Sequence, residues 1–120
     1  MNTPKPFWLV ILKAWLPDHS NPNMPGPKFR PVLVLDVNPD TKQMLVVYGT
    51  SQKTQYPGLG EFTVDCEGLS KPTKFCFNYQ RWIPATDEYL CLNGKKHVIG
   101  KLPPKYYPRV AEALSDVENQ

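Results

Sequence analysis

The chain alternates between short apolar runs and clusters of proline, glycine and polar residues. Short runs rich in strand-forming side chains are typical of β-strands, and the breaks between them mark turns. Fourteen prolines in 120 residues remove backbone donors throughout, which excludes long helices from most of the sequence. The expected strands are residues 7–15, 31–37, 43–50, 61–65, 75–77 with 79–83, and 97–99.

Only the C-terminus has the spacing of a helix. Prolines 103 and 104 set its start, since proline is tolerated in a first helical turn. The apolar residues of its inner face are Val110, Ala111, Leu114 and Val117. The acidic residues expected to face outward are Glu112, Asp116 and Glu118. The pattern predicts a mainly β protein with one amphipathic C-terminal helix packed on a sheet or barrel.

Composition narrows the class of protein. The length favours one domain over residues 1–120, and the formal charge of +3 permits an anionic partner without requiring one. Three cysteines without a C-x-x-C motif, and two histidines far apart, predict reduced thiols and no metal site. The apolar run 7–12 is too short to span a bilayer, so we expect no membrane partner and a cytoplasmic location.

The most informative stretch is residues 28–35, where Lys28 and Arg30 lead through Pro31 into an apolar strand. A loop rich in proline, asparagine and glycine precedes it. A guanidinium fixed at the mouth of a rigid strand is well placed to hold a phosphate. The alternative is that Arg30 only covers apolar surface with its stem.

A second polar group, Thr50, Ser51 and Gln52, follows the expected strand 43–50. The turn at 38–41 should make strands 31–37 and 43–50 antiparallel neighbours, which places Arg30 near Thr50 and Ser51. One cation and two hydroxyl groups at one sheet edge suit the oxygens of a phosphodiester. The alternative is that these residues only begin a polar loop.

A third group lies at residues 78–82. Arg81 would add a cation to the same groove, and Tyr79 or Trp82 would stack on an unpaired base. The alternative makes Trp82 a core residue and Arg81 a solvated charge. No paired carboxylates and no G-x-x-x-x-G-K-[ST] loop are present, so metal-dependent phosphoryl chemistry has little support.

Four segments in order resemble the MazF/PemK (Kid) family of toxin endoribonucleases from bacterial toxin–antitoxin modules. They are residues 28–35 (KFRPVLVL), residues 49–57 (GTSQ followed by YP), residues 78–83 (NYQRWI) and residues 99–114 (IGKL followed by VAEAL). Together they extend over about 90 of the 120 residues.

The resemblance implies a small SH3-like β-barrel of the CcdB/PemK type, usually a homodimer. It also implies metal-independent, sequence-selective cleavage of single-stranded RNA, in which the 2′-hydroxyl attacks phosphorus and leaves a 2′,3′-cyclic phosphate. No cofactor is implied. A cognate antitoxin would inhibit the enzyme, and the gene would be bacterial or carried by a phage or plasmid.

By motif match, Arg30 and Thr50 would be the catalytic residues. Arg30 would stabilise the crowded phosphate, and Thr50 would donate to a non-bridging oxygen. The residues expected to bind RNA are Lys28, Ser51, Gln52, Asn78, Arg81, Trp82 and His19.

A departure from the family pattern leaves alternatives open. Asn78 stands where some members carry an aspartate, and an amide cannot act as a general base, so His19 in the long loop is a candidate substitute. One alternative function is a catalytically inactive relative that inhibits a host protein, as the CcdB toxins bind DNA gyrase. Another is a plain single-strand nucleic-acid module.

Overall fold

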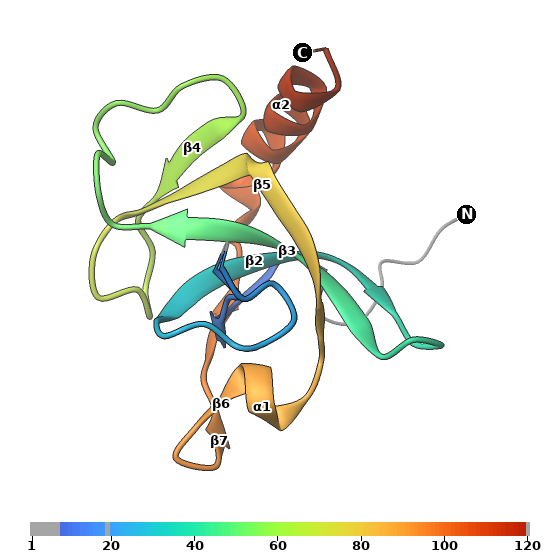
Figure 1. Ribbon diagram of the computed structural model, residues 1–120. Helices are drawn as coiled ribbons and strands as arrows, with labels where there is room; N and C mark the ends of the chain where they lie inside the picture. The colour runs from blue at the N-terminus through green and yellow to red at the C-terminus, as the bar shows by residue number, and fades with distance from the viewer. Residues whose placement is uncertain (1–7, 19, 120) are drawn as a thin grey trace.

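The computed structural model describes residues 8–18 and 20–119, which form a curved antiparallel sheet with helices at its two ends (Figure 1). Within these residues, six strands pair in the order β4-β5-β3-β2-β1-β8. The strands are β1 (Val10–Trp15), β2 (Phe29–Asn38), β3 (Gln43–Thr50), β4 (Glu61–Val64), β5 (Thr73–Pro84) and β8 (Val98–Lys101). A separate hairpin is formed by β6 (Cys91–Leu92) and β7 (Lys95–Lys96), and the helices are α1 (Asp87–Leu90), η1 (Pro104–Tyr106) and α2 (Tyr107–Glu118).

The hydrophobic pattern located the strands well, and the differences lie at their ends. Strand β3 has both predicted bounds, and β2 extends beyond its predicted range at both ends. Strand β1 starts later than expected because Trp8 and Leu9 form a turn in which Leu9 has a φ of 57°. The first residue of the predicted strand, Phe7, lies outside the described residues.

Strand β5 runs through Asn78, where the sequence pattern divided it, but it bulges there. Val47 of β3 pairs with Gln80, whereas the next residue, Tyr48, pairs with Cys76. Residues 77–79 of β5 therefore have no opposite residue in β3. Such a bulge bends a strand and changes the direction of its side chains.

Two hydrophobic clusters lie on the two faces of the sheet, which explains why β2 is apolar on both faces. Leu33 belongs to the cluster that α2 covers, whereas its neighbours Val32 and Val34 belong to the cluster that α1 covers. Figure 1 shows α2 and α1 at opposite ends of the sheet. The largest fully buried side chains of the first cluster include Phe75, Phe77, Leu9, Ile11 and Leu33.

Side chains of α2 differ in part from the predicted amphipathic pattern. Val110 is buried as expected, but Ala113 is the buried alanine and Ala111 is exposed. Asp116 does not face outward, because its carboxylate accepts a hydrogen bond from the Gly60 amide at 3.2 Å. This bond joins α2 to the loop between β3 and β4.

The expectation that only the C-terminus is helical was wrong. Helix α1 is a single turn, too short to show helical periodicity, and it forms because Tyr89 and Leu90 are buried against the second cluster. The β6–β7 hairpin was also missed, although Asn93-Gly94 is a strong hairpin signal. Both residues have positive φ, 54° and 76°, as that turn requires. None of the described helices is long and apolar enough to cross a bilayer.

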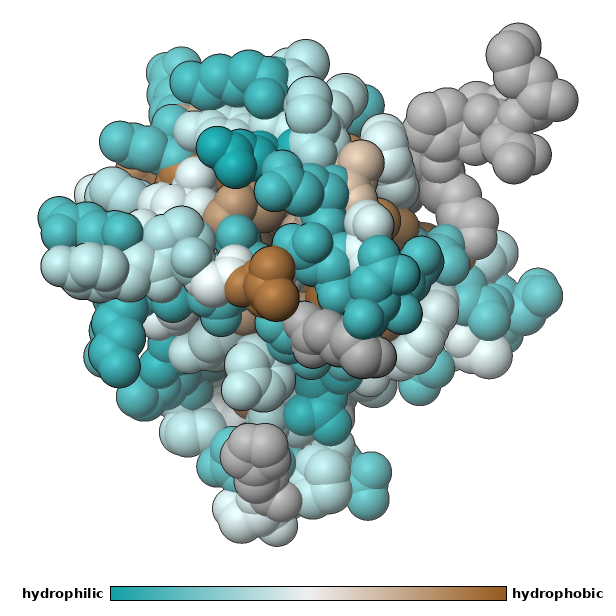
Figure 2. Space-filling view, turned by 90° about the horizontal axis from the view of Figure 1, so that it is seen from above, coloured by the Kyte–Doolittle hydropathy of each residue, from teal (hydrophilic) through white to brown (hydrophobic). Residues whose placement is uncertain are grey.

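The surface is mainly hydrophilic. Figure 2 shows one face on which polar side chains predominate and apolar side chains form small patches between them. The large hydrophobic side chains that are exposed in the described part of the chain are Met24, Tyr56, Leu59, Tyr79, Trp82, Leu92 and Val98.

Candidate functional site

A groove of about 760 Å³ lies at the end of the sheet where β2 begins and β3 ends. Its walls come from β2, β3, β5 and both ends of the loop that joins β1 to β2. We call it the Arg30 groove. Its lining residues are Leu16, Pro17, Asp18, Pro27, Lys28, Arg30, Val46, Tyr48, Tyr79, Gln80 and Arg81.

Arg30 is held in this groove by Tyr48. Its Nη1 donates a hydrogen bond of 2.9 Å to Tyr48 Oη, and its guanidinium carbon lies 5.4 Å from the centre of the same ring. The register explains the contact, since Val32 pairs with Tyr48 and Arg30 is thus the diagonal neighbour of Tyr48 on one face. The hydroxyl proton of Tyr48 remains available for donation, because Arg30 uses only the oxygen.

Two tyrosine rings form the aromatic wall of the groove. Tyr48 and Tyr79 meet edge to face, with ring centres 6.4 Å apart and planes at 79°. Tyr79 is 64% exposed and directly follows Asn78 in the β5 bulge. An exposed ring at the side of a groove offers a stacking surface to an unpaired base.

Arg81 fixes the loop on the other side of the groove. Its Nη1 donates to the Pro17 carbonyl at 3.2 Å, across 64 residues of sequence. Its Nε is buried and has no hydrogen-bond partner among the described residues. Arg81 therefore connects β5 to the end of the β1–β2 loop as well as adding a positive charge to the groove.

Thr50 ends β3 near the start of β2, but it lines neither the Arg30 groove nor the neighbouring cavity. Continuing the β2–β3 register by two residues from Val32 and Tyr48 brings Arg30 opposite Thr50. Thr50 Oγ1 accepts a hydrogen bond of 3.1 Å from the Gln52 amide. This turn leaves the hydroxyl hydrogen of Thr50 free to donate.

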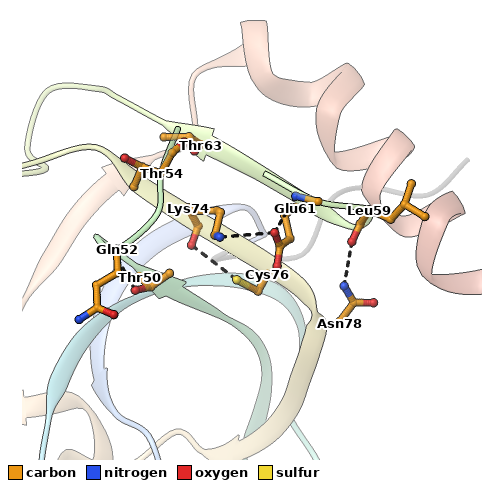
Figure 3. Close-up of polar contacts among 10 residues, drawn as sticks. Thr50, Gln52, Thr54, Leu59, Glu61, Thr63, Lys74, Cys76 and Asn78 are labelled. Atoms are coloured by element: carbon orange, nitrogen blue, oxygen red, sulfur yellow. Dashed lines mark hydrogen bonds and ion pairs between the residues drawn. The ribbon is translucent and has the colours of Figure 1, made fainter. Parts of the chain in front are cut away.

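Next to Thr50 lies a partly buried ion pair that joins β5 to β4 (Figure 3). Lys74, directly opposite Thr50, has its Nζ 3.4 Å from Glu61 Oε1. The hydrogen bond from the Gly58 amide, followed by the charge of Lys74, lowers the pKa of Glu61. Burial, followed by the charge of Glu61, raises the pKa of Cys76 to about 11, so this thiol is protonated at neutral pH.

Three side-chain hydrogen bonds, one of them to the Glu61 carboxylate, hold the loop between β3 and β4. Glu61 Oε1 accepts the Gly58 amide hydrogen at 2.7 Å, and Thr63 Oγ1 donates to the Thr54 carbonyl at 2.6 Å. Asn78 Nδ2 donates to the Leu59 carbonyl at 2.9 Å (Figure 3). The loop that begins with Thr50 is thus tied to β4 and β5 at several points.

The structure separates the predicted RNA-binding residues. Lys28 and Arg81 line the Arg30 groove, whereas Ser51 and Gln52 line a second, neighbouring cavity. Of the described candidates, Thr50, Asn78 and Trp82 line neither cavity. Trp82 pairs with Leu45, and it faces away from Arg81 because adjacent strand residues point to opposite faces. His19 lies outside the described residues.

Sequence reasoning gave no role to three residues of the site. Tyr48 ends an apolar strand and has no motif of its own, although the predicted hairpin register already made it a diagonal neighbour of Arg30. Asp18 brings a carboxylate to the groove from the β1–β2 loop, and Lys74 forms the ion pair next to Thr50. These last two had no sequence signal, because a loop and a distant strand place them. In the described part of the chain, no group of three or more His, Cys, Asp and Glu side chains is arranged to hold a metal ion.

Comparison with solved structures supports the predicted fold, whereas the two comparisons of sequence found no match. No protein-family model matches the sequence, and no curated protein sequence matches it. A solved structure described as an endoribonuclease in complex with its cognate antitoxin, from a mycobacterial species, matches with a TM-score of 0.65. The match covers 96% of each chain at 14% sequence identity. The predicted fold, mainly β with a C-terminal helix, is confirmed, and the resemblance to MazF/PemK toxins is supported at the level of fold.

Proposed function

We propose that the chain is an endoribonuclease that cleaves single-stranded RNA in the Arg30 groove without a metal ion. The observation that carries the proposal is the Arg30–Tyr48 pair, an immobilised cation and hydroxyl in an aromatic groove. The fold shared with an endoribonuclease supports it. So does the β2–β3 register, which, continued by two residues past Val32 and Tyr48, brings Thr50 opposite Arg30, since a phosphodiester needs fixed donors around its oxygens.

The reaction is an internal transesterification. The 2′-hydroxyl attacks the adjacent phosphorus, the bond to the 5′-oxygen breaks, and the products are a 2′,3′-cyclic phosphate and a 5′-hydroxyl. Arg30 and the Thr50 hydroxyl stabilise the negative charge that gathers on the non-bridging oxygens.

Proton transfer uses two further groups of the groove. The one carboxylate in the described lining is that of Asp18, whose Oδ1 accepts hydrogen bonds from the amide and hydroxyl of Ser20 and the amide of Asn21. It is the group proposed to take the 2′-hydroxyl proton in exchange for these bonds, while the Tyr48 hydroxyl donates a proton to the departing 5′-oxygen. The Arg30 guanidinium, 2.9 Å from Tyr48 Oη, holds this hydroxyl in position. This arrangement needs neither Asn78 nor His19 as a base.

Substrate binding uses the remaining wall of the groove. Tyr79 stacks on an unpaired base, Lys28 neutralises backbone charge, and Arg81 holds the β1–β2 loop against the substrate. Selectivity for particular RNA sequences would come from this loop, which supplies Leu16, Pro17 and Asp18 to the lining.

We further propose two protein partners. One is a second copy of the chain, as the sequence resemblance implies, and the other is an antitoxin. The antitoxin proposal is supported by the solved structure of similar fold, which is described in complex with its cognate antitoxin. Light scattering of the purified protein tests for the homodimer. Co-purification with the product of an adjacent small gene tests for the antitoxin.

The experiment is a cleavage assay on a long single-stranded RNA with chelator present. We expect fragments with 5′-hydroxyl ends, and loss of cleavage in Arg30→Ala. Arg109→Ala is the matched control, because Arg109 is an exposed arginine of α2 that lines neither cavity and lies 3.9 Å from Glu112. Absence of cleavage by the wild type, or equal cleavage by Arg30→Ala, contradicts the proposal. Stoichiometric capture of one host protein would then favour an inhibitor.

A further inference from the structure

A second cavity, of about 400 Å³, lies beside the Arg30 groove and shares Lys28 and Arg30 with it. Its other walls come from β1, the end of β3 and the loop between β4 and β5. Lys13, Pro31 and Gly49 lie on the sheet face opposite to Tyr48, so the two cavities open on the two sides of one sheet edge. We call this cavity the Lys71 pocket.

The Lys71 pocket has the chemistry of an anion site. Three lysines line it, Lys13, Lys28 and Lys71, and none of the described residues lining it carries a carboxylate. Arg30 also borders it, with its guanidinium directed to Tyr48 on the other face. Two further lining side chains, Ser51 and Ser70, carry hydroxyl groups, whereas the hydroxyl of Thr73 already donates to the Lys71 carbonyl at 3.2 Å. Lysines and hydroxyls around a polar cavity bind phosphate oxygens.

The floor of the pocket is formed by closely packed backbone at Gly49. A Cβ there would lie 2.7 Å from the Pro31 carbonyl oxygen and 2.9 Å from side-chain atoms of Thr73 and Phe75. Only glycine lets the strands approach this closely without displacing backbone. The floor is therefore fixed in shape before any ligand binds.

The pocket suits a phosphate better than a base. Phe29, its only aromatic residue among those described, already contacts Trp15 at 4.9 Å and His97 at 5.4 Å between ring centres. The Nζ of Lys13 lies 6.0 Å from the same ring. With its ring so surrounded, Phe29 offers little free surface for stacking, and the cations remain as the groups that recognise a ligand.

The linings of the two cavities are much richer in positive charge than the chain as a whole. Together they contain five cations, Lys13, Lys28, Arg30, Lys71 and Arg81, and one carboxylate, Asp18, in their described linings. The whole chain carries a net charge of only +3. A continuous basic track of this kind follows a nucleic-acid backbone.

We propose that the Lys71 pocket binds backbone phosphates of the RNA segment that continues from the Arg30 groove past the cleaved linkage. The inference rests on the proposed function and deepens it by adding a sequence-independent subsite. Bases are read in the aromatic groove, and the flanking phosphates are held by Lys13 and Lys71. Arg30 and Lys28 lie at the boundary between the two.

The test measures binding of a fluorescein-labelled, 2′-O-methylated 12-nucleotide RNA, which lacks the attacking hydroxyl, over a series of salt concentrations. We expect Lys71→Gln and Lys13→Gln each to weaken binding roughly three- to fivefold. Each should also reduce the slope of log affinity against log salt by about 0.7. Lys105→Gln is the matched control, since Lys105 is exposed, lies 5.2 Å from the Tyr106 ring and lines neither cavity.

Three outcomes separate this inference from the proposed function. If Lys71→Gln and Lys13→Gln match Lys105→Gln while the wild type cleaves RNA, the subsite is absent and the proposed function stands. If the lysines control binding but the unmodified RNA is not cleaved, the subsite stands and the proposed cleavage fails. If inorganic phosphate or a mononucleotide occupies the pocket without displacing the RNA probe, the pocket serves a free anion, which overturns the inference.

Discussion

Arg30 Nη1 lies 2.9 Å from Tyr48 Oη, and the guanidinium lies 5.4 Å from the centre of the same ring. Tyr48 thus fixes the position of the arginine through both its hydroxyl and the face of its ring. The pair joins the start of β2 to the end of β3, two segments that the β2–β3 hairpin brings together. Its chemical consequence is a hydroxyl donor held in a fixed position beside a cation.

Removing only the hydroxyl of Tyr48 should separate catalysis from binding. We expect Tyr48→Phe to lower kcat about 100-fold, because the departing 5′-oxygen loses its proton donor. The KM should change little, since the ring still supports Arg30. Tyr56→Phe, which removes a hydroxyl from an exposed ring outside both cavities, should behave as the wild type. Equal kcat values for the two variants would exclude Tyr48 as the acid.

The exposed ring of Tyr79 should contribute mainly to affinity. Tyr79→Ala should weaken binding of a single-stranded oligonucleotide by about 1–3 kcal/mol through loss of base stacking, and Tyr79→Phe should restore it. Fluorescence anisotropy measures both. The control is Tyr56→Ala, which removes a ring that is 77% exposed but lies outside the groove. Weak binding by Tyr79→Phe as well would assign the effect to the hydroxyl instead.

Arg81 should act through the loop that it holds. Losing its hydrogen bond to the Pro17 carbonyl should cost about 1–2 kcal/mol of local stability. We expect Arg81→Ala to be cut faster by protease in the β1–β2 loop and to lose cleavage activity. Arg109→Ala, which removes an exposed arginine of α2, should change neither property. Unchanged proteolysis together with weakened RNA binding would mean that Arg81 contacts RNA directly.

The Glu61–Lys74 pair should make stability depend on pH. The pKa of Glu61 is lowered in the folded state from its ordinary value of 4.5. Its stabilising contribution is therefore complete above that value and is lost as pH falls through the folded pKa. Urea unfolding at pH 7 should show Glu61→Gln less stable than the wild type by about 1–2 kcal/mol.

The difference between wild type and Glu61→Gln should vanish in acid, below the lowered pKa of Glu61. Glu112→Gln is the control, because Glu112 is exposed and lies 3.9 Å from Arg109 at the surface. Its effect on the free energy of unfolding should stay small at every pH. A difference between wild type and Glu61→Gln that persists unchanged at low pH would show that the charge of Glu61 is not involved.

Particular residues show which parts of the fold and the site could be predicted from the sequence. The Asn38–Thr41 turn predicted the β2–β3 hairpin and, with it, the position of Arg30 level with Thr50. The sequence pattern offered both Trp82 and Tyr79 for stacking, and the bulge at 77–79 brought Tyr79 to the groove. A bulge is invisible in a hydrophobic pattern, since it depends on which residues of two strands pair.

The sequence by itself determined what depends on neighbours along the chain. Apolar runs, proline breaks and one hairpin turn were enough for the six strands of the main sheet, the C-terminal helix and the β2–β3 hairpin. Only the tertiary structure decided which cations share a cavity. Lys13, Lys28 and Lys71 come from three separate segments, and Arg81 contacts Pro17 across 64 residues. Such contacts follow from sheet order and curvature, which are set by burial of the whole core rather than by any local signal.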